Sequence, residues 1–177
     1  MDSVELIADV LKYVVPALLV LLTVRFMRDS YLQQDRDLSS ARMKTELVKE
    51  RIPLKLNAYE RAILFLERIN PENLLIRIHP LDKQVSLYHQ ELVHEIRTEY
   101  EHNLSQQLYM NNQAWASLVN AKEEILSIIH TSAKELGRED SALELSKRIL
   151  NKWLSMEVSP TQKAIFVIKN DANSLFS

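Results

Sequence analysis

The chain contains no cysteine and only one glycine among its 177 residues. The lack of cysteine excludes disulfides, thiolate metal sites and cysteine nucleophiles. Strand-rich folds use glycine in turns and bulges, so a single glycine favours an all-α fold and excludes glycine-rich phosphate loops. Neither sign of charge dominates, since the formal net charge is −2, and the sequence shows no basic patch typical of nucleic-acid binding. We therefore predict a helical protein that binds no nucleic acid and carries no cofactor.

Long apolar runs are rare as well, and the exception lies near the N-terminus. Residues 13–24 include no charged side chain. Extended to Leu6 and Met27, the segment spans about 33 Å as a helix, enough for a bilayer core of roughly 30 Å. We predict a single-pass transmembrane helix here, within an anchor of residues 1–28. The alternative is a helix buried in a soluble protein. A cleaved signal peptide is disfavoured because acidic residues precede the apolar run.

Basic residues flank this run unequally. Lys12 stands before the uncharged part, close enough to the end of the segment to reach lipid headgroups, and Arg25 and Arg28 follow it. Basic residues gather on the cytoplasmic side of membrane helices. We therefore expect the N-terminus outside and the long C-terminal part in the cytoplasm, with these three side chains setting the topology and contacting headgroups.

Residues 29–52 form a mixed-charge stretch with few apolar positions. We predict a solvated helical stalk that ends at Pro53, because proline lacks a backbone N–H and its ring clashes inside a helix. Fewer than three clean heptads are present, so a short coiled coil joining two copies of the chain is an open alternative. Residues 53–177 then suit one helical domain.

Apolar residues in this domain recur every three or four positions, which predicts an irregular bundle of five to six helices. Asn70 followed by Pro71 begins a short helix, with asparagine as the N-cap. Asp82 or Ser86 caps a longer helix that ends near Asn103.

The second half of the domain carries similar boundaries. A strongly periodic helix covers residues 113–136, and Gly137 is expected at its C′ position. Asp140 or Ser141 caps the next helix, and Ser159 caps the last, which begins at Pro160. The side chains expected to face the core are Leu56, Tyr59, Ile63, Leu66, Ile69, Val85, Tyr88, Leu92, Ile96, Tyr100, Trp115, Leu118, Val119, Ile125, Ile129, Ala133, Leu145, Ile149, Leu150, Trp153, Leu154, Ile165, Phe166 and Ile168.

Two Glu-x-x-His pairs, Glu91 with His94 and Glu99 with His102, resemble the motif of di-metal sites in helical bundles. Those sites take their motifs from different helices, whereas both pairs here fall on one helix. His94 also points away from its apolar face. We therefore predict no metal site. His89 lies on the core side and is expected to be a hydrogen-bonded core histidine.

Polar residues also fall on the apolar face of this helix. Asn103 is at the centre of the face and Glu99 at its edge, and unsatisfied burial would cost about 1–3 kcal/mol. Two interpretations stand: a buried network that fixes helix register, joined by glutamines, or a polar pocket that recognises a partner. The candidate partner-binding residues are Glu99, His102, Asn103, Gln106, Gln107, Tyr109 and Trp115.

Three segments resemble a family of uncharacterised membrane-anchored proteins from Bacteroidota: AYERAILFLERINPENLLIRI at residues 58–78, EYEHNLSQQLYM at residues 99–110 with Trp115 shortly after, and SPTQKAIFVIK at residues 159–169. Members are similar in having one hydrophobic N-terminal helix followed by a helical body. The resemblance implies this fold, anchoring in a bacterial inner membrane, and no particular activity, because the family is a domain of unknown function.

Anchor, stalk and helical body without an assembled reactive group indicate a non-catalytic adaptor or accessory subunit of a membrane complex. Its protein partner is expected to contact residues 103–115. Two alternatives remain: an enzyme that binds metal through Glu91, Glu95, Glu99 and His102, and a soluble helical protein.

Overall fold

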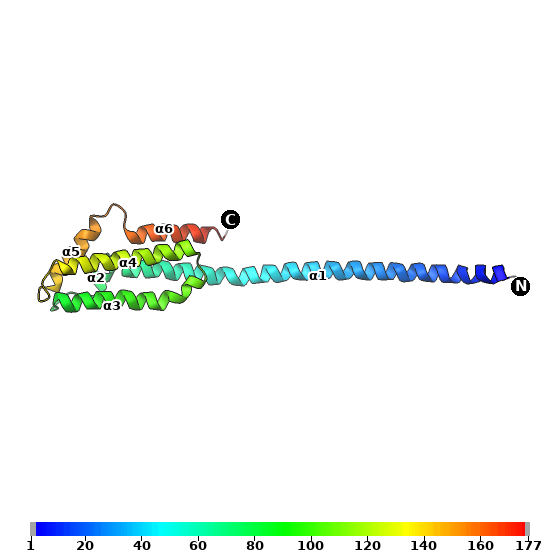
Figure 1. The fold of residues 1–177 in the computed structure, drawn as a ribbon, viewed down its shortest axis with the longest axis horizontal. Helices are drawn as coiled ribbons and strands as arrows, with labels where there is room; N and C mark the ends of the chain where they lie inside the picture. The colour runs from blue at the N-terminus through cyan, green and yellow to red at the C-terminus, as the bar shows by residue number, and fades with distance from the viewer. Residues whose placement is uncertain (1–2, 176–177) are drawn as a thin grey trace. The chain divides into compact units, whose positions relative to one another are not determined.

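A computed structural model of the chain describes the backbone of residues 3–175 and the side chains of residues 14, 18–28, 46 and 49–175. Within this part the chain forms seven helices and no strand, which confirms the all-α prediction (Figure 1). The helices are α1 (Ser3–Ile69), α2 (Pro71–Arg77), α3 (Val85–Asn103), the 3₁₀ helix η1 (Leu104–Leu108), α4 (Asn112–Lys134), α5 (Ala142–Leu154) and α6 (Pro160–Asn173). The chain divides into two compact units, Met1–Glu50 and Arg51–Ser177.

Helix α1 is continuous through Pro53, so the predicted end of the helix at this residue is wrong. An internal proline removes one hydrogen bond from the helix, at a cost of about 3 kcal/mol, and the bonds on either side hold the helix together. The stalk side chains at 29–45 and 47–48, and with them the possible coiled coil, lie outside the described residues.

The predicted transmembrane helix falls only partly on described side chains, because Lys12 and the other side chains of residues 6–13 and 15–17 lie outside them. In the described part of the chain, no helix combines the length and the apolarity that crossing a membrane requires. The described residues 18–28 are all exposed to solvent.

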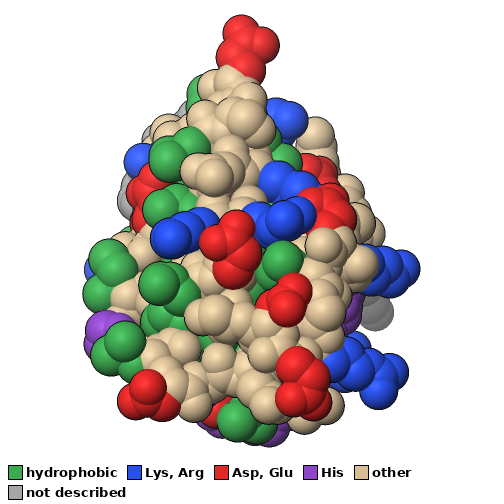
Figure 2. Space-filling view, turned by 90° about the vertical axis from the view of Figure 1, so that its left-hand side faces the viewer, with side chains coloured by type: hydrophobic (Ala, Val, Ile, Leu, Met, Phe, Trp, Pro, Cys, Tyr) green, Lys and Arg blue, Asp and Glu red, His purple; other side chains and the backbone are tan. Residues whose placement is uncertain are grey.

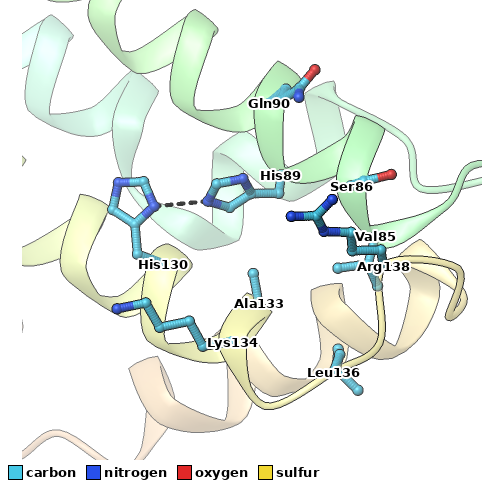
Figure 3. A pocket seen from close by; sticks show the side chains of 9 residues that line it. All are labelled: Val85, Ser86, His89, Gln90, His130, Ala133, Lys134, Leu136 and Arg138. Carbon is cyan, nitrogen blue, oxygen red and sulfur yellow. Dashed lines mark hydrogen bonds between the residues drawn. The ribbon is translucent and has the colours of Figure 1, made fainter.

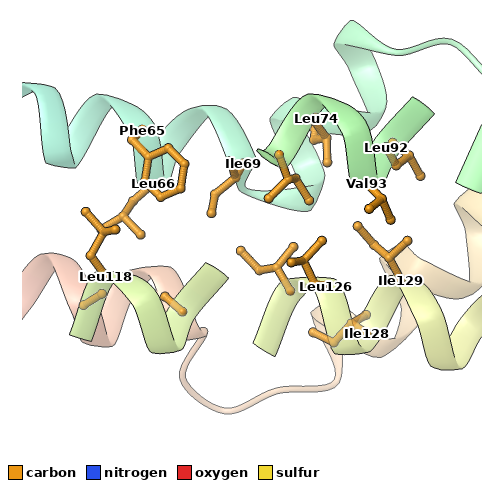
Figure 4. Packing of buried hydrophobic residues seen from close by; sticks show 14 of the residues in the cluster. Phe65, Leu66, Ile69, Leu74, Leu92, Val93, Leu118, Leu126, Ile128 and Ile129 are labelled. Atoms are coloured by element: carbon orange, nitrogen blue, oxygen red, sulfur yellow. The ribbon is translucent and has the colours of Figure 1, made fainter. Parts of the chain in front are cut away.

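The unit Arg51–Ser177 is a bundle in which α4 packs against α3, α5 and α6. Phe65 and Leu66 of α1 face Leu118 of α4 across the core (Figure 4). Helix α6 is fixed at its C-terminal end by Asp171, which accepts hydrogen bonds from the hydroxyl of Tyr59 at 2.7 Å and from the backbone N–H of Asn111 at 3.2 Å. These bonds tie the start of α4 to both α1 and α6.

Most of the predicted core residues are buried or half-buried, but two are not. Leu154 and Phe166 were expected to face inward and are 62% and 66% exposed. Leu154 is the last residue of α5, and the buried face of α6 runs through Thr161, Ala164 and Ile168 instead of Phe166. Around the end of the bundle drawn in Figure 2, acidic and basic side chains are interspersed.

Local capping signals located several helix starts correctly. The side chain of Asn70 accepts a hydrogen bond from the Glu72 N–H at 3.0 Å and Pro71 begins α2. Ser141 and Ser159 cap α5 and α6 as predicted.

The start of α3 and the end of α4 differ from the prediction. The N-cap of α3 is Gln84, neither Asp82 nor Ser86, and its side chain makes no capping bond. Helix α4 ends at Lys134, so Gly137 lies beyond the expected C′ position and has no positive φ. Its N–H donates instead to the Asp140 carboxylate at 2.7 Å, which closes the turn before α5.

Candidate functional site

The polar pair predicted on the α3 face is buried. Glu99 is 9% exposed and Asn103 is 7% exposed. The amide of Asn103 donates to the backbone carbonyl of Glu99 at 2.7 Å, and its side-chain oxygen accepts from Nε of Arg61 at 3.4 Å. The end of α3 is thereby joined to α1 through an amide that is satisfied on both sides.

The carboxylate of Glu99 is held by two arginines from other helices. Arg68 of α1 lies at 2.5 Å and Arg77 of α2 at 3.6 Å, and Arg77 also pairs with Glu95. A buried carboxylate paired with cations avoids the cost of an isolated buried charge. The cluster therefore joins three helices. The partners of Glu99 are arginines, whereas the sequence suggested glutamines.

The remaining candidate residues do not join this cluster. Gln106 is half-buried and its side-chain amide donates to Ser105 at 3.3 Å, while His102, Gln107 and Tyr109 are exposed. The 3₁₀ helix η1 also exposes two apolar side chains, Leu104 at 41% and Leu108 at 79%.

Trp115 belongs to an aromatic stack instead of the polar cluster. Its ring centroid lies 5.8 Å from that of Tyr100, which in turn lies 6.0 Å from Phe65. The ammonium of Lys122 lies over the Tyr100 ring, 4.1 Å from its centroid, as in a cation–π contact. Trp115 is half-buried, so this stack extends from the core to the surface at the first turn of α4.

The carboxylates of the metal-enzyme alternative are each paired with a base. Glu91 lies 2.5 Å from Nζ of Lys83, and Glu95 pairs with Arg77. Among the described residues, no group of three or more His, Cys, Asp or Glu side chains is placed to hold a metal ion.

A histidine pair is the contact that the sequence did not reveal. Nε2 of His89 on α3 lies 2.7 Å from Nδ1 of His130 on α4, and the ring centroids are 4.9 Å apart (Figure 3). The prediction that His89 is hydrogen-bonded is confirmed, although its partner was not identified and the side chain is half-buried. Burial, and then the charge of His130, lowers the pKa of His89 below its ordinary value of 6.5. One clue to this pair was present in the sequence, because His89 and His130 each border the apolar face of their helix.

Comparison with known proteins gives one assignment. Neither the search of curated proteins nor the search of solved structures produced a match. A family model described as a family of unknown function, DUF7935, matches residues 5–175. This match covers nearly the whole chain, including most of α1, the Glu99 cluster and the histidine pair, and the chain therefore belongs to the DUF7935 family.

Proposed function

We propose that this protein is a non-catalytic adaptor or accessory subunit, anchored in a bacterial inner membrane by residues 6–27. The observation that carries the anchor is the exposure of large apolar side chains on every side of α1 within the described residues 18–27. Leu18, Leu21 and Phe26 are 53%, 69% and 75% exposed, and Leu19, Val20, Leu22, Val24 and Met27 each exceed half. Successive residues of a helix point about 100° apart, so no face of this segment is polar.

A helix that is apolar all round needs a cover, which is either a protein core or lipid. Lipid is favoured here by the uncharged run at residues 13–24 and by the exposed Arg25 and Arg28 directly after it. Each basic residue near an anionic membrane surface contributes about 1 kcal/mol to binding.

The arginines also give the proposal an orientation that can be measured. With Arg25 and Arg28 inside, the N-terminus is outside and the bundle is in the cytoplasm. Because the chain has no cysteine, a single cysteine in place of exposed Glu139 can be labelled selectively. A maleimide that cannot cross membranes should label Glu139→Cys only after cells are opened, and Asp2→Cys in intact spheroplasts. The reverse pattern would contradict this orientation.

We propose that the partner contacts the exposed part of residues 103–115. Leu108 is 79% exposed on η1, beside the exposed Leu104, Gln107 and Tyr109. Exposed apolar and aromatic side chains next to polar ones are typical of a protein interface.

Crosslinking from native membranes tests the adaptor role. A photoreactive amino acid in place of Leu108 should form a discrete crosslink to one membrane-complex subunit. The same amino acid in place of Leu143, which is 49% exposed on α5, should not. Leu108→Glu should abolish co-purification of that subunit, and Leu143→Glu should retain it. A protein that leaves the membrane alone and monodisperse, with no crosslink at residue 108, would contradict the proposal.

A further inference from the structure

A pocket of about 510 Å³ lies between the first half of α3 and the last turns of α4, next to the turn that follows α4 (Figure 3). Its volume suits a small molecule, since ligand pockets span roughly 300–1,000 Å³. The apolar part of the pocket wall is formed by Val85, Ala133 and Leu136. The polar lining consists of Ser86, His89, Gln90, His130, Lys134 and Arg138.

Every ionisable side chain that lines this pocket is a base. Lys134 and Arg138 are exposed, and in the described part of the chain neither is ion-paired with a carboxylate. This differs from the Glu99 cluster, where each carboxylate has an arginine. Arg138 can bind an oxyanion through two parallel hydrogen bonds, and Lys134 adds a second positive charge. Ser86 and Gln90 add uncharged donors from α3.

The histidine pair adds donors whose number depends on pH. In the neutral pair, one ring donates the 2.7 Å bond and the other accepts it. The two outer nitrogens, Nδ1 of His89 and Nε2 of His130, are then one donor and one acceptor. One added proton makes both outer nitrogens donors while the central hydrogen bond persists. The protonated pair therefore offers two N–H groups and a positive charge.

We propose that this pocket binds a small oxyanion bearing two charges, a phosphate group that is either free or carried by a small organic molecule. Arg138 and Lys134 hold the anion, Ser86 and Gln90 donate to it, and the His89–His130 pair takes up one proton as it binds. The site lies within the bundle and is independent of the membrane anchor and of the partner surface at η1.

The protonation state of the histidines in the empty pocket decides how anion affinity changes with pH. Burial and His130 keep the pKa of His89 below 6.5, so the His89 ring of the empty pocket is neutral near neutral pH. The charged groups lining the pocket with the pair are Lys134 of α4 and Arg138 after it, both cations, and α3 contributes only uncharged Ser86 and Gln90. A bound anion favours the protonated pair. For an anion whose own charge does not change, such as sulfate, affinity must therefore rise as the pH falls through the range in which histidine titrates, about pH 8 to pH 5.

Calorimetric titration of the full chain in detergent micelles tests the site. Inorganic phosphate and glycerol phosphate distinguish a free from an organic phosphate, and acetate tests whether one negative charge suffices. Arg138→Gln removes a charge-assisted contact and should weaken phosphate binding about ten- to a hundredfold. Arg97→Gln and Lys169→Gln remove exposed cations that do not line the pocket and should leave the affinity unchanged. Sulfate, which keeps two charges over this range, should bind more tightly at low pH, and His130→Gln should flatten that dependence.

NMR spectra of the unaltered protein provide a test that does not depend on whether the variants fold. Of the five histidines, the ring resonances of His89 and His130 should shift on addition of phosphate, while exposed His94 and His79 should not. Absence of saturable binding of both inorganic phosphate and glycerol phosphate would overturn the proposal. Acetate binding as tight as phosphate binding would overturn it as well, as would equal loss of affinity in Arg138→Gln and Arg97→Gln. Sulfate affinity that does not vary with pH would overturn the proton uptake.

Discussion

The double variant Val14→Arg/Leu18→Arg should leave the membrane fraction during carbonate extraction, whereas the unaltered protein should stay in it. Both positions lie near the centre of residues 6–27, and their side chains are 50% and 53% exposed. An arginine near the centre of a membrane helix costs about 3 kcal/mol for insertion, and each replaced apolar residue forfeits a further few tenths of a kcal/mol. The pair therefore lowers the stability of the inserted state by roughly 6–7 kcal/mol, or four to five orders of magnitude in partitioning.

A matched control separates this effect from added charge. Leu87→Arg/Leu143→Arg adds the same two charges to the bundle, at side chains that are 50% and 49% exposed. This protein should remain in the carbonate-resistant pellet. Retention of the Val14→Arg/Leu18→Arg protein in the pellet, together with its control, would show that lipid does not surround this segment.

The second large effect is expected in the bundle, where Phe65→Ala should lower the free energy of unfolding by about 3–5 kcal/mol. Phe65 is 1% exposed and contacts Tyr100 in the aromatic stack, so truncation leaves a cavity that its neighbours cannot fill. Urea unfolding followed by tryptophan fluorescence measures this change. Both tryptophans, Trp115 and Trp153, belong to Arg51–Ser177, so the signal reports on the bundle alone.

Phe166→Ala provides the same chemical change at a side chain that is 66% exposed on α6. A substitution at such a surface position typically changes stability by no more than about 0.5 kcal/mol. Equal destabilisation by Phe65→Ala and Phe166→Ala would contradict the described core and would support the inward position that the sequence pattern suggested for Phe166.

The helices whose ends are set by neighbouring residues were predictable from the sequence. At Asn70, Ser141 and Ser159, the capping side chain accepts a hydrogen bond from an N–H two or three residues later. Such a bond depends only on local residues, so residue type and spacing reveal it. Burial of Glu99 and Asn103 was predictable for a similar reason, since helical periodicity alone places them on or beside the apolar face.

The start of α3 was not predictable, because its first N–H groups bond to a distant loop. Val85 N–H donates to the carbonyl of Asp140 at 2.9 Å and Ser86 N–H to that of Arg138 at 3.2 Å. With these groups satisfied by the turn between α4 and α5, no capping side chain is needed at Gln84.

Partners in the candidate sites also come from distant parts of the chain. Arg68 and Arg77 reach Glu99 from α1 and α2, and His130 of α4 forms a hydrogen bond with His89 of α3. The periodicity of one helix shows which face is buried and does not show which residue lies opposite. The local pattern therefore suggested glutamines as partners of Glu99 and did not identify the hydrogen-bond partner of His89.

A spin label at residue 20 tests the central proposal, that lipid surrounds the N-terminal part of α1. Val20→Cys carries the only cysteine in the chain, so a nitroxide attached there reports on this position alone. In liposomes, collisions with oxygen, which partitions into lipid, should be frequent, and collisions with a water-soluble nickel chelate should be rare. The label at Lys169→Cys, which is exposed on α6, should show the opposite pattern. Frequent chelate collisions at residue 20, or few collisions with either reagent, would place this segment in water or inside protein and contradict the anchor.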